Sequence, residues 1–114
     1  MPCDKNTLIH NSFDNIYVIG DAGTFPSGKT ASGARKQAKV LAQRMRDHVR
    51  GRKPEATYDG HTVCPVYTRH GRAMFAEFNY TRNISPARES YIKWLIHIHM
   101  MRRLYWNFML KGLF

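Results

Sequence analysis

The first half of the chain follows a strand-like pattern and then a helix-like pattern. Residues 1–14 are polar and turn-like, whereas residues 15–21 (NIYVIGD) form a short apolar run rich in β-branched side chains. Such a run predicts a strand buried on both faces, as in a parallel sheet. Across residues 29–50 small and apolar side chains recur at steps of three and four, which predicts an amphipathic helix that ends at residues 51–54 (GRKP). The predicted apolar stripe consists of Ala31, Ala34, Ala38, Leu41 and Met45.

The second half predicts a hairpin. Residues 62–68 and 73–80 have the composition of strands, and residues 69–72 (RHGR) have that of a tight turn. Pro65 lacks a backbone N–H, so the first of these strands is expected at a sheet edge or at a bulge.

A helix is predicted after the hairpin, over residues 87–111 and with a break near Met100. Ser85 is its expected N-cap, and Pro86 suits the first helical position because its missing N–H is not needed there.

Composition narrows the class of protein. The chain has 114 residues, enough for one small domain but too few for a TIM barrel or a complete kinase. Lys and Arg number 18 against 8 acids, giving a net charge of +10, so an anionic partner is expected. We predict neither a signal peptide nor a conventional membrane-spanning helix. The two cysteines, Cys3 and Cys64, have no zinc-site spacing, and no metal site is predicted.

The C-terminal segment combines aromatic and basic side chains without acids after Glu89. One predicted helical stripe contains Trp94, Ile98, Met101, Tyr105, Phe108 and Met109, and the opposite face carries Lys93, His97, Asn107 and Lys111. This pattern is typical of a helix lying in the headgroup region of an anionic bilayer. A buried packing helix or an oligomer contact has the same apolar character and stays an alternative.

Two interpretations compete for the loop before the first helix. Residues 23–30 (GTFPSGKT) fit the phosphate-binding P-loop pattern. However, no later strand offers the second magnesium-binding Asp, and Asp21 at the strand end would repel phosphate. Alternatively, Gly20 and Asp21 end a strand, and the Asp21 carboxylate there accepts hydrogen bonds from sugar or ribityl hydroxyls. The helix that follows offers N–H groups and a positive dipole end to an anion or electron-rich ring.

The second interpretation agrees with a resemblance to a known family. Residues 15–21 followed by residues 26–30 (PSGKT) look like the last FAD-binding element of flavoproteins with two dinucleotide-binding domains. Residues 62–65 (TVCP), 76–80 (AEFNY) and 104–112 (LYWNFMLKG) resemble the C-terminal part of sulfide:quinone oxidoreductases. The resemblance implies an α/β fold (α+β as an isolated fragment). It would contain the last strand and helix of a Rossmann-like FAD domain, a β-hairpin and C-terminal amphipathic helices.

The resemblance also implies roles for particular residues. Asp21, following Gly20, would bind the ribityl-phosphate region of FAD, and Lys29 and Thr30 would stabilise negative charge on the reduced flavin. Cys64 would be one of two redox cysteines: sulfide attacks the cysteine bridge and leaves a persulfide, and two electrons pass through FAD to quinone. Val63, Trp94, Tyr105 and Trp106 would lie near the quinone or the membrane. Without the resemblance, Cys64 reads as a small buried hydrophobe; Cys3 matches nothing in the family and is expected to be incidental.

The resemblance divides the chain into three predicted parts. Residues 1–60 would be the end of the FAD-binding domain, residues 61–84 the redox-cysteine hairpin, and residues 85–114 the amphipathic membrane- and quinone-proximal helices. The family's Gly-x-Gly-x-x-Gly motif and a partner cysteine upstream are absent from these 114 residues. We therefore expect a fragment that neither holds FAD tightly nor oxidises sulfide without the missing N-terminal half.

The expected location is peripheral, monotopic attachment to a bacterial or mitochondrial inner membrane. A non-catalytic membrane-surface or interaction protein and, less favoured, a P-loop nucleotide binder are the alternatives. Nucleic acid is not an expected partner. The basic helix at residues 29–50 lacks grouped base-reading side chains, and no helix-turn-helix or zinc pattern accompanies it.

Overall fold

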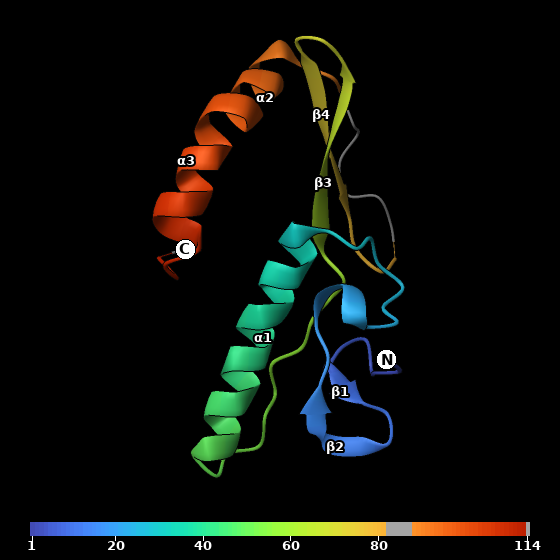
Figure 1. The fold of residues 1–114 in the computed structure, drawn as a ribbon. Helices are drawn as coiled ribbons and strands as arrows, with labels where there is room; N and C mark the ends of the chain where they lie inside the picture. Colours follow the sequence, from blue (N-terminus) through green and yellow to red (C-terminus); the bar gives the residue numbers. More distant parts are fainter. Residues whose placement is uncertain (82–87, 114) are drawn as a thin grey trace. The chain divides into compact units, whose positions relative to one another are not determined.

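The chain forms two compact units in the computed structural model, which describes residues 1–81 and 88–113. Among these, residues 1–64 and 77–81 belong to the first unit, and residues 65–76 and 88–113 to the second. The elements are two small β-hairpins, one long helix and a C-terminal helical segment (Figure 1). This mixture of helices and antiparallel strands confirms the predicted α/β class.

The first hairpin differs from the strand predicted at residues 15–21. Strand β1 (Ile9–His10) pairs antiparallel with β2 (Phe13–Tyr17), with Ile9 opposite Tyr17. The prediction of a parallel strand buried on both faces is therefore wrong for the chain in this structure. The physical reason is that a two-stranded ribbon covers little of its own surface, and the Phe13 side chain is 55% exposed.

Helix α1 (Ala31–Val49) confirms the predicted helix and its ends. Thr30 is the N-cap, and its hydroxyl accepts a hydrogen bond from the Gly33 N–H at 3.0 Å. Gly51, with φ +65°, follows the C-cap in the left-handed conformation that terminates many helices.

The buried face of α1 is displaced from the predicted stripe. The buried residues are Gly33, Gln37 and Arg44, whereas Ala38 is exposed and Met45 is 50% exposed. Polar side chains are buried because they have specific partners: the Arg44 guanidinium donates to the carbonyls of Pro54 and Ala56 at 3.2 and 2.8 Å. Periodicity located the helix but not the face that packs.

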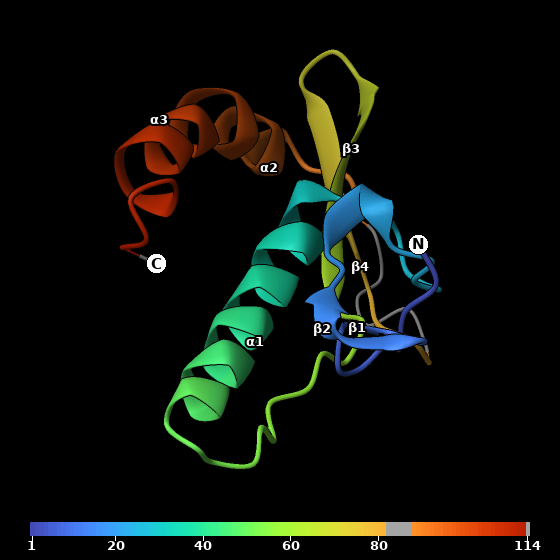
Figure 2. The same cartoon turned by 60° about the horizontal axis from the view of Figure 1, so that its bottom comes forward.

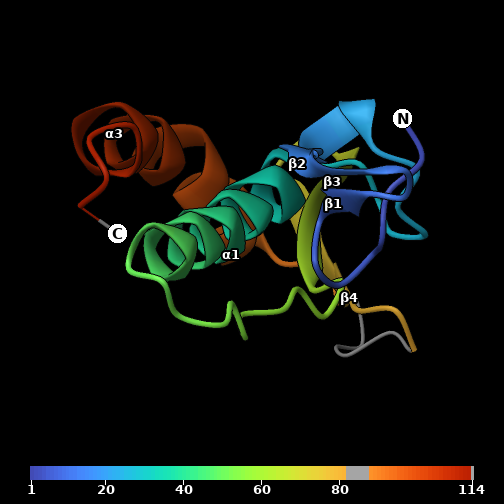
Figure 3. The same cartoon turned by 90° about the horizontal axis from the view of Figure 1, so that it is seen from below.

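The core of the first unit lies beside α1. Its buried members are Cys3, Leu8, Val18, Phe25 and Tyr58, and Val40 and Leu41 of α1 pack against them together with Tyr80. Figures 2 and 3 both show β1 and β2 on the same side of α1. Cys3, expected to be incidental in a polar terminus, is a core residue with 9% of its surface exposed.

The second hairpin confirms the sequence prediction within two residues. Strand β3 (Thr62–Arg69) and strand β4 (Arg72–Phe78) are joined by His70 and Gly71, so they run antiparallel. Gly71 has φ +72°, a conformation that glycine adopts without strain. The base of this hairpin belongs to the first unit and its tip to the second.

The C-terminal helical segment begins later than predicted. It runs through α2 (Tyr91–Leu95), a π-helical stretch (Ile96–Met101), α3 (Arg102–Leu104) and a second π-helical stretch (Tyr105–Met109). The prediction of helix over residues 88–90 is wrong, because Ser90 instead forms an antiparallel bridge with Ala73. Ser85 and Pro86 lie outside the described residues. The predicted break near Met100 is wrong, because the segment stays helical through Met100 and only its winding changes, at Ile96, Arg102 and Tyr105. No described helix is long and apolar enough to span a bilayer.

Aromatic contacts hold the start of this segment on the hairpin tip. The ring of Trp94 lies 5.3 Å from that of His70, and the His97 ring lies 5.4 Å from Tyr67 and 6.1 Å from Phe75. The Tyr67 hydroxyl also hydrogen-bonds the His97 imidazole. Trp94 and His97 are one helical turn apart, so their side chains lie on the same face of the helix. His97 therefore packs on the hairpin together with Trp94 and does not belong to a solvated polar face.

Acid is expected to loosen the connection just before α2. Hydrogen bonds from Thr68 and Arg69 lower the pKa of the exposed Glu89 carboxyl. A carboxyl group whose pKa is lower in the folded state stabilises that state at pH values above its unfolded pKa. This contribution is lost as the pH falls through the folded pKa. We predict that the Ser90 amide, which donates to the Ala73 carbonyl at 2.9 Å, loses hydrogen-exchange protection on acidification. A Glu89→Gln variant should show weaker protection already at neutral pH; equal protection in both proteins would contradict the prediction.

Candidate functional site

A short turn and the loop after it form one side of the candidate site. The 3-10 turn Gly20–Ala22 carries Asp21, whose side chain is exposed. The Lys29 ammonium donates to the Asp21 main-chain carbonyl at 2.7 Å, so the cation closes the loop between them. An exposed carboxylate and a cation are thereby held within one loop.

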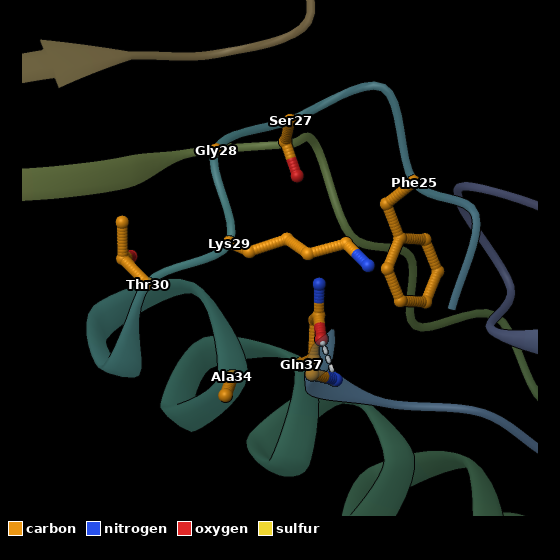
Figure 4. Close-up of a pocket in the computed structure, with 8 residues that line it drawn as sticks. Phe25, Ser27, Gly28, Lys29, Thr30, Ala34 and Gln37 are labelled. Carbon is orange, nitrogen blue, oxygen red and sulfur yellow. Dashed lines mark hydrogen bonds between the residues drawn. The ribbon is translucent and has the colours of Figure 1, made fainter. Parts of the chain in front are cut away.

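A small pocket lies between this loop and the first turns of α1 (Figure 4). The Lys29 side chain crosses it, with the Ser27 hydroxyl on the loop side and the Gln37 amide on the helix side. Gln37 is only 3% exposed, and its side-chain oxygen accepts from the Gly20 N–H at 2.7 Å. The lining residues are Gly20, Phe25, Ser27, Gly28, Lys29, Thr30, Ala34 and Gln37.

The backbone conformation of the turn depends on Gly20, which has φ +61°. Residues other than glycine adopt this conformation at a cost of roughly 1 kcal/mol or more. The buried Gln37 amide fixes the same residue from the helix side. The position of Asp21 relative to α1 is therefore determined by one glycine and one buried amide.

Strand β3 is attached directly to the start of α1. The Thr62 hydroxyl, fully buried, hydrogen-bonds the hydroxyl of the N-cap Thr30. Gly33 permits this approach, because a Cβ there would lie 3.2 Å from the Thr62 hydroxyl oxygen and 3.3 Å from that of Tyr58. The absence of a side chain at Gly33 therefore lets β3 lie close to the first turn of α1.

Cys64 follows Thr62 by two residues on β3. Alternate residues of a strand share one face, so Cys64 is on the same side of β3 as the Thr62 contact with α1. The Cys64 side chain is half-buried, and no disulfide joins it to Cys3. The strand thus carries a thiol on the face that meets the helix N-terminus.

A cluster of three contacting side chains, each charged or titratable, lies at the base of the second hairpin. The His61 imidazole contacts the Lys36 ammonium of α1 through Nδ1 and the Glu77 carboxylate of β4 through Nε2. No local sequence pattern predicts this cluster, because Lys36 and Glu77 are 25 and 16 residues from His61. Beside it, burial raises the pKa of the Tyr58 hydroxyl, which donates to the His61 carbonyl at 3.1 Å.

The structure brings together some of the predicted site residues. Gly20, Lys29 and Thr30 line one pocket, and Asp21 lies in the turn beside it. Val63 is half-buried and lies between Thr62 and Cys64 on β3. Their proposed roles stay predictions.

The predicted membrane- and quinone-proximal aromatics lie in the second unit and differ in exposure. Trp94 is half-buried against the hairpin tip, whereas Tyr105 is 44% exposed and Trp106 61% exposed. Among the described residues no cluster of His, Cys, Asp and Glu is arranged to hold a metal ion.

Comparison with curated proteins identifies homologues over nearly the whole chain. The mouse mitochondrial sulfide:quinone oxidoreductase is 36% identical over 96% of this chain, and that of Dictyostelium discoideum is 33% identical over the same share. The Schizosaccharomyces pombe enzyme is 28% identical, again over 96%. The chain spans about a quarter of these relatives: 26%, 25% and 26% of their lengths, respectively.

Among solved structures, a chain of the Tetrahymena thermophila mitochondrial ATP synthase matches with a TM-score of 0.70. The match covers 90% of this chain and 27% of that chain at 23% identity, so it shows a shared fold and nothing further. No family model matches the chain. The curated relatives nevertheless confirm the resemblance predicted from the motifs: the chain is a homologue of sulfide:quinone oxidoreductases that corresponds to about a quarter of their length.

Proposed function

We propose that this chain is the C-terminal part of a sulfide:quinone oxidoreductase and supplies a flavin-facing helix terminus and one redox cysteine. The observation that carries the proposal is the attachment of β3 to α1 through Thr30 and Thr62, with Cys64 two residues further along the same face. The homology supports it, because the relatives that match nearly all of this chain are named for that activity.

The residues present fit one end of an FAD site. Gly20 supplies the left-handed turn, and the exposed Asp21 carboxylate is an acceptor for a sugar or ribityl hydroxyl. The Lys29 cation and the N-terminus of α1 provide positive electrostatic potential for an electron-rich ring or an anion. FAD, when bound, supplies the two-electron acceptor that carries reducing equivalents from sulfide to quinone.

Cys64 is the proposed sulfur acceptor in a disulfide with a second cysteine, which we expect outside this chain because Cys3 is buried in the core. Sulfide attacks one sulfur of the bridge, a new S–S bond forms there as a persulfide, and the other cysteine leaves as a thiolate. The half-buried position of Cys64 leaves part of its side chain accessible to a small anion.

The P-loop interpretation of residues 23–30 is less well supported by the contacts. In a nucleotide-binding P-loop the Ser or Thr hydroxyl coordinates Mg²⁺ and the Lys reaches the phosphates. Here the Thr30 hydroxyl caps α1 and bonds Thr62, and the Lys29 ammonium bonds a main-chain carbonyl. The Thr30 hydroxyl and the Lys29 ammonium are therefore used in contacts within the protein rather than for binding Mg²⁺ and phosphate.

Peripheral membrane attachment is proposed for the C-terminal segment. Large apolar side chains are exposed there beside Arg102, Arg103 and Lys111, a combination that suits an interfacial helix. The exposed members are Tyr91, Ile92, Ile98, Met100, Tyr105, Trp106, Phe108, Leu110 and Leu113.

Vesicle binding tests this attachment. We predict that the chain co-sediments with anionic phospholipid vesicles and that Trp106→Ser weakens partitioning severalfold, because an exposed indole is removed. Phe13→Ser, at a residue of similar exposure in the first unit, is the control and should bind as the parent does. Binding that is unchanged in the Trp106 variant would contradict the assignment.

A chimeric enzyme tests the proposed function itself. The homologous quarter of the mouse enzyme is replaced by this chain, and flavin content and sulfide-dependent quinone reduction are measured. We expect a flavin-loaded chimera that reduces quinone. A chimera that retains flavin but does not respond to sulfide would refute the proposal.

A further inference from the structure

The cluster of Lys36, His61 and Glu77 connects three segments that determine where β3 lies. Lys36 is on α1, His61 immediately precedes β3, and Glu77 is on β4. Its members are largely shielded from solvent: the His61 side chain is 19% exposed and that of Glu77 33% exposed. Cys64 lies on β3, three residues after His61.

The chemistry of the contacts fixes the protonation state in which they coexist. A Lys ammonium is only a donor and a carboxylate only an acceptor. His61 must therefore accept at Nδ1 from Lys36 and donate from Nε2 to Glu77, which is the neutral imidazole with its proton on Nε2. A doubly protonated imidazole donates from both nitrogens, so it cannot accept from Lys36.

We propose that Lys36, His61 and Glu77 form a pH-sensitive latch that positions the Cys64-bearing strand against α1, with His61 as its titrating member. When His61 is protonated, its pair with Glu77 is strengthened, while its contact with Lys36 becomes a like-charge repulsion. Acid thus releases the hairpin base from α1 and leaves the two hairpin strands paired. The inference rests on the proposed role of Cys64, which the latch would align.

Other groups that contact His61 do not oppose the release of the hairpin base from α1 by acid. The Asp59 carboxylate accepts from the His61 main-chain N–H at 2.9 Å, and the Tyr58 hydroxyl donates to its carbonyl. Both hold the backbone of His61 and leave the ring nitrogens to Lys36 and Glu77. Histidine is the side chain that ordinarily changes charge between pH 5 and 8, so this is the interval in which the latch is tested.

The test measures the reactivity of Cys64 in the full 114-residue chain, without flavin or sulfide. Cys3→Ala makes Cys64 the sole thiol, and its alkylation rate by a neutral maleimide is followed from pH 5 to 8. The rate of a His61→Leu variant is divided by that of the parent at each pH, which cancels the titration of the thiol itself. We expect a ratio of several-fold at pH 8, because the unlatched strand exposes Cys64, falling to one at pH 5.

A non-titrating replacement distinguishes the latch from a merely structural histidine. The amide of His61→Gln can accept from Lys36 and donate to Glu77 but does not change charge. Its rate should match the parent at pH 8 and be severalfold slower than the parent at pH 5. A ratio for His61→Leu that is one at pH 8 or independent of pH would overturn the proposal.

This outcome is separate from that of the proposed function. An inactive flavin-loaded chimera would refute the oxidoreductase role even if the alkylation ratios behave as expected. Conversely, pH-independent ratios would remove the latch and leave the role of Cys64 in sulfide oxidation intact.

Discussion

Replacing Cys64 by alanine is expected to abolish sulfide-dependent quinone reduction in the chimeric enzyme. Cys64 is the proposed covalent acceptor of sulfur, and loss of a covalent nucleophile typically lowers turnover by several orders of magnitude. Flavin content should not change, because the side chains proposed to face FAD are Asp21 and Lys29 rather than Cys64. The expected result is therefore a flavin-loaded protein without sulfide-dependent activity.

The matched control is the other cysteine. Cys3 is buried among Leu8, Val18 and other core residues, so Cys3→Ala creates a small cavity without removing a proposed reactive group. We expect reduced thermal stability and retained turnover. If the Cys3 variant loses activity while holding flavin and the Cys64 variant keeps it, the assignment of the redox cysteine is wrong.

Replacing Gly33 by valine is expected to separate β3 from the first turn of α1. A Cβ at this position would lie 3.2 Å from the Thr62 hydroxyl oxygen and 3.3 Å from the Tyr58 hydroxyl oxygen, and valine adds two methyl groups beyond it. Overpacking of this kind costs about 1–3 kcal/mol. Valine favours a helix over glycine by a few tenths of a kcal/mol, which does not offset that cost. We predict a lower free energy of unfolding, measured by urea denaturation, and faster alkylation of Cys64.

Ala38→Val on the same helix provides the comparison. Ala38 is exposed, so this change carries only the propensity cost of a β-branched residue, roughly 0.5 kcal/mol. A Gly33→Val variant as stable as the parent would contradict the close approach of β3 to α1. A loss equal to that of Ala38→Val would do the same.

Local patterns in the sequence predicted the elements that depend on local rules. The N-cap at Thr30, the glycine after α1 and the hairpin turn at Gly71 each follow from backbone geometry within a few residues. The two ends of this helix and the hairpin turn were therefore predicted to within one or two residues of their observed positions, whereas the N-cap role of Thr30 was not predicted.

Features that depend on distant partners could not be predicted in this way. Ser90 bridges Ala73 instead of entering a helix, and β2 pairs with a two-residue strand that has no pattern of its own. Gln37 lies in the predicted helix, but its burial depends on the Gly20 amide, 17 residues earlier.

The features of the candidate site fall into the same two groups: those that follow from local sequence patterns and those that depend on distant partners. The strand-end glycine and acid, the following lysine and the cysteine–proline pair carried the resemblance, so Asp21, Lys29 and Cys64 could be predicted as site residues from the sequence alone. The Thr30–Thr62 contact that attaches the cysteine strand to the helix joins residues 32 apart. Single-sequence reasoning has no means of pairing two threonines at that separation.

The most direct test of the central claim is where sulfur is held when the chimera is given sulfide without an acceptor. Mass spectrometry of the non-reduced protein should find one additional sulfur atom on the peptide that contains Cys64 or on its disulfide partner, and none in the Cys64→Ala chimera. Sulfur retained equally in the Cys64→Ala chimera would contradict the account, because the redox cysteine would then lie elsewhere.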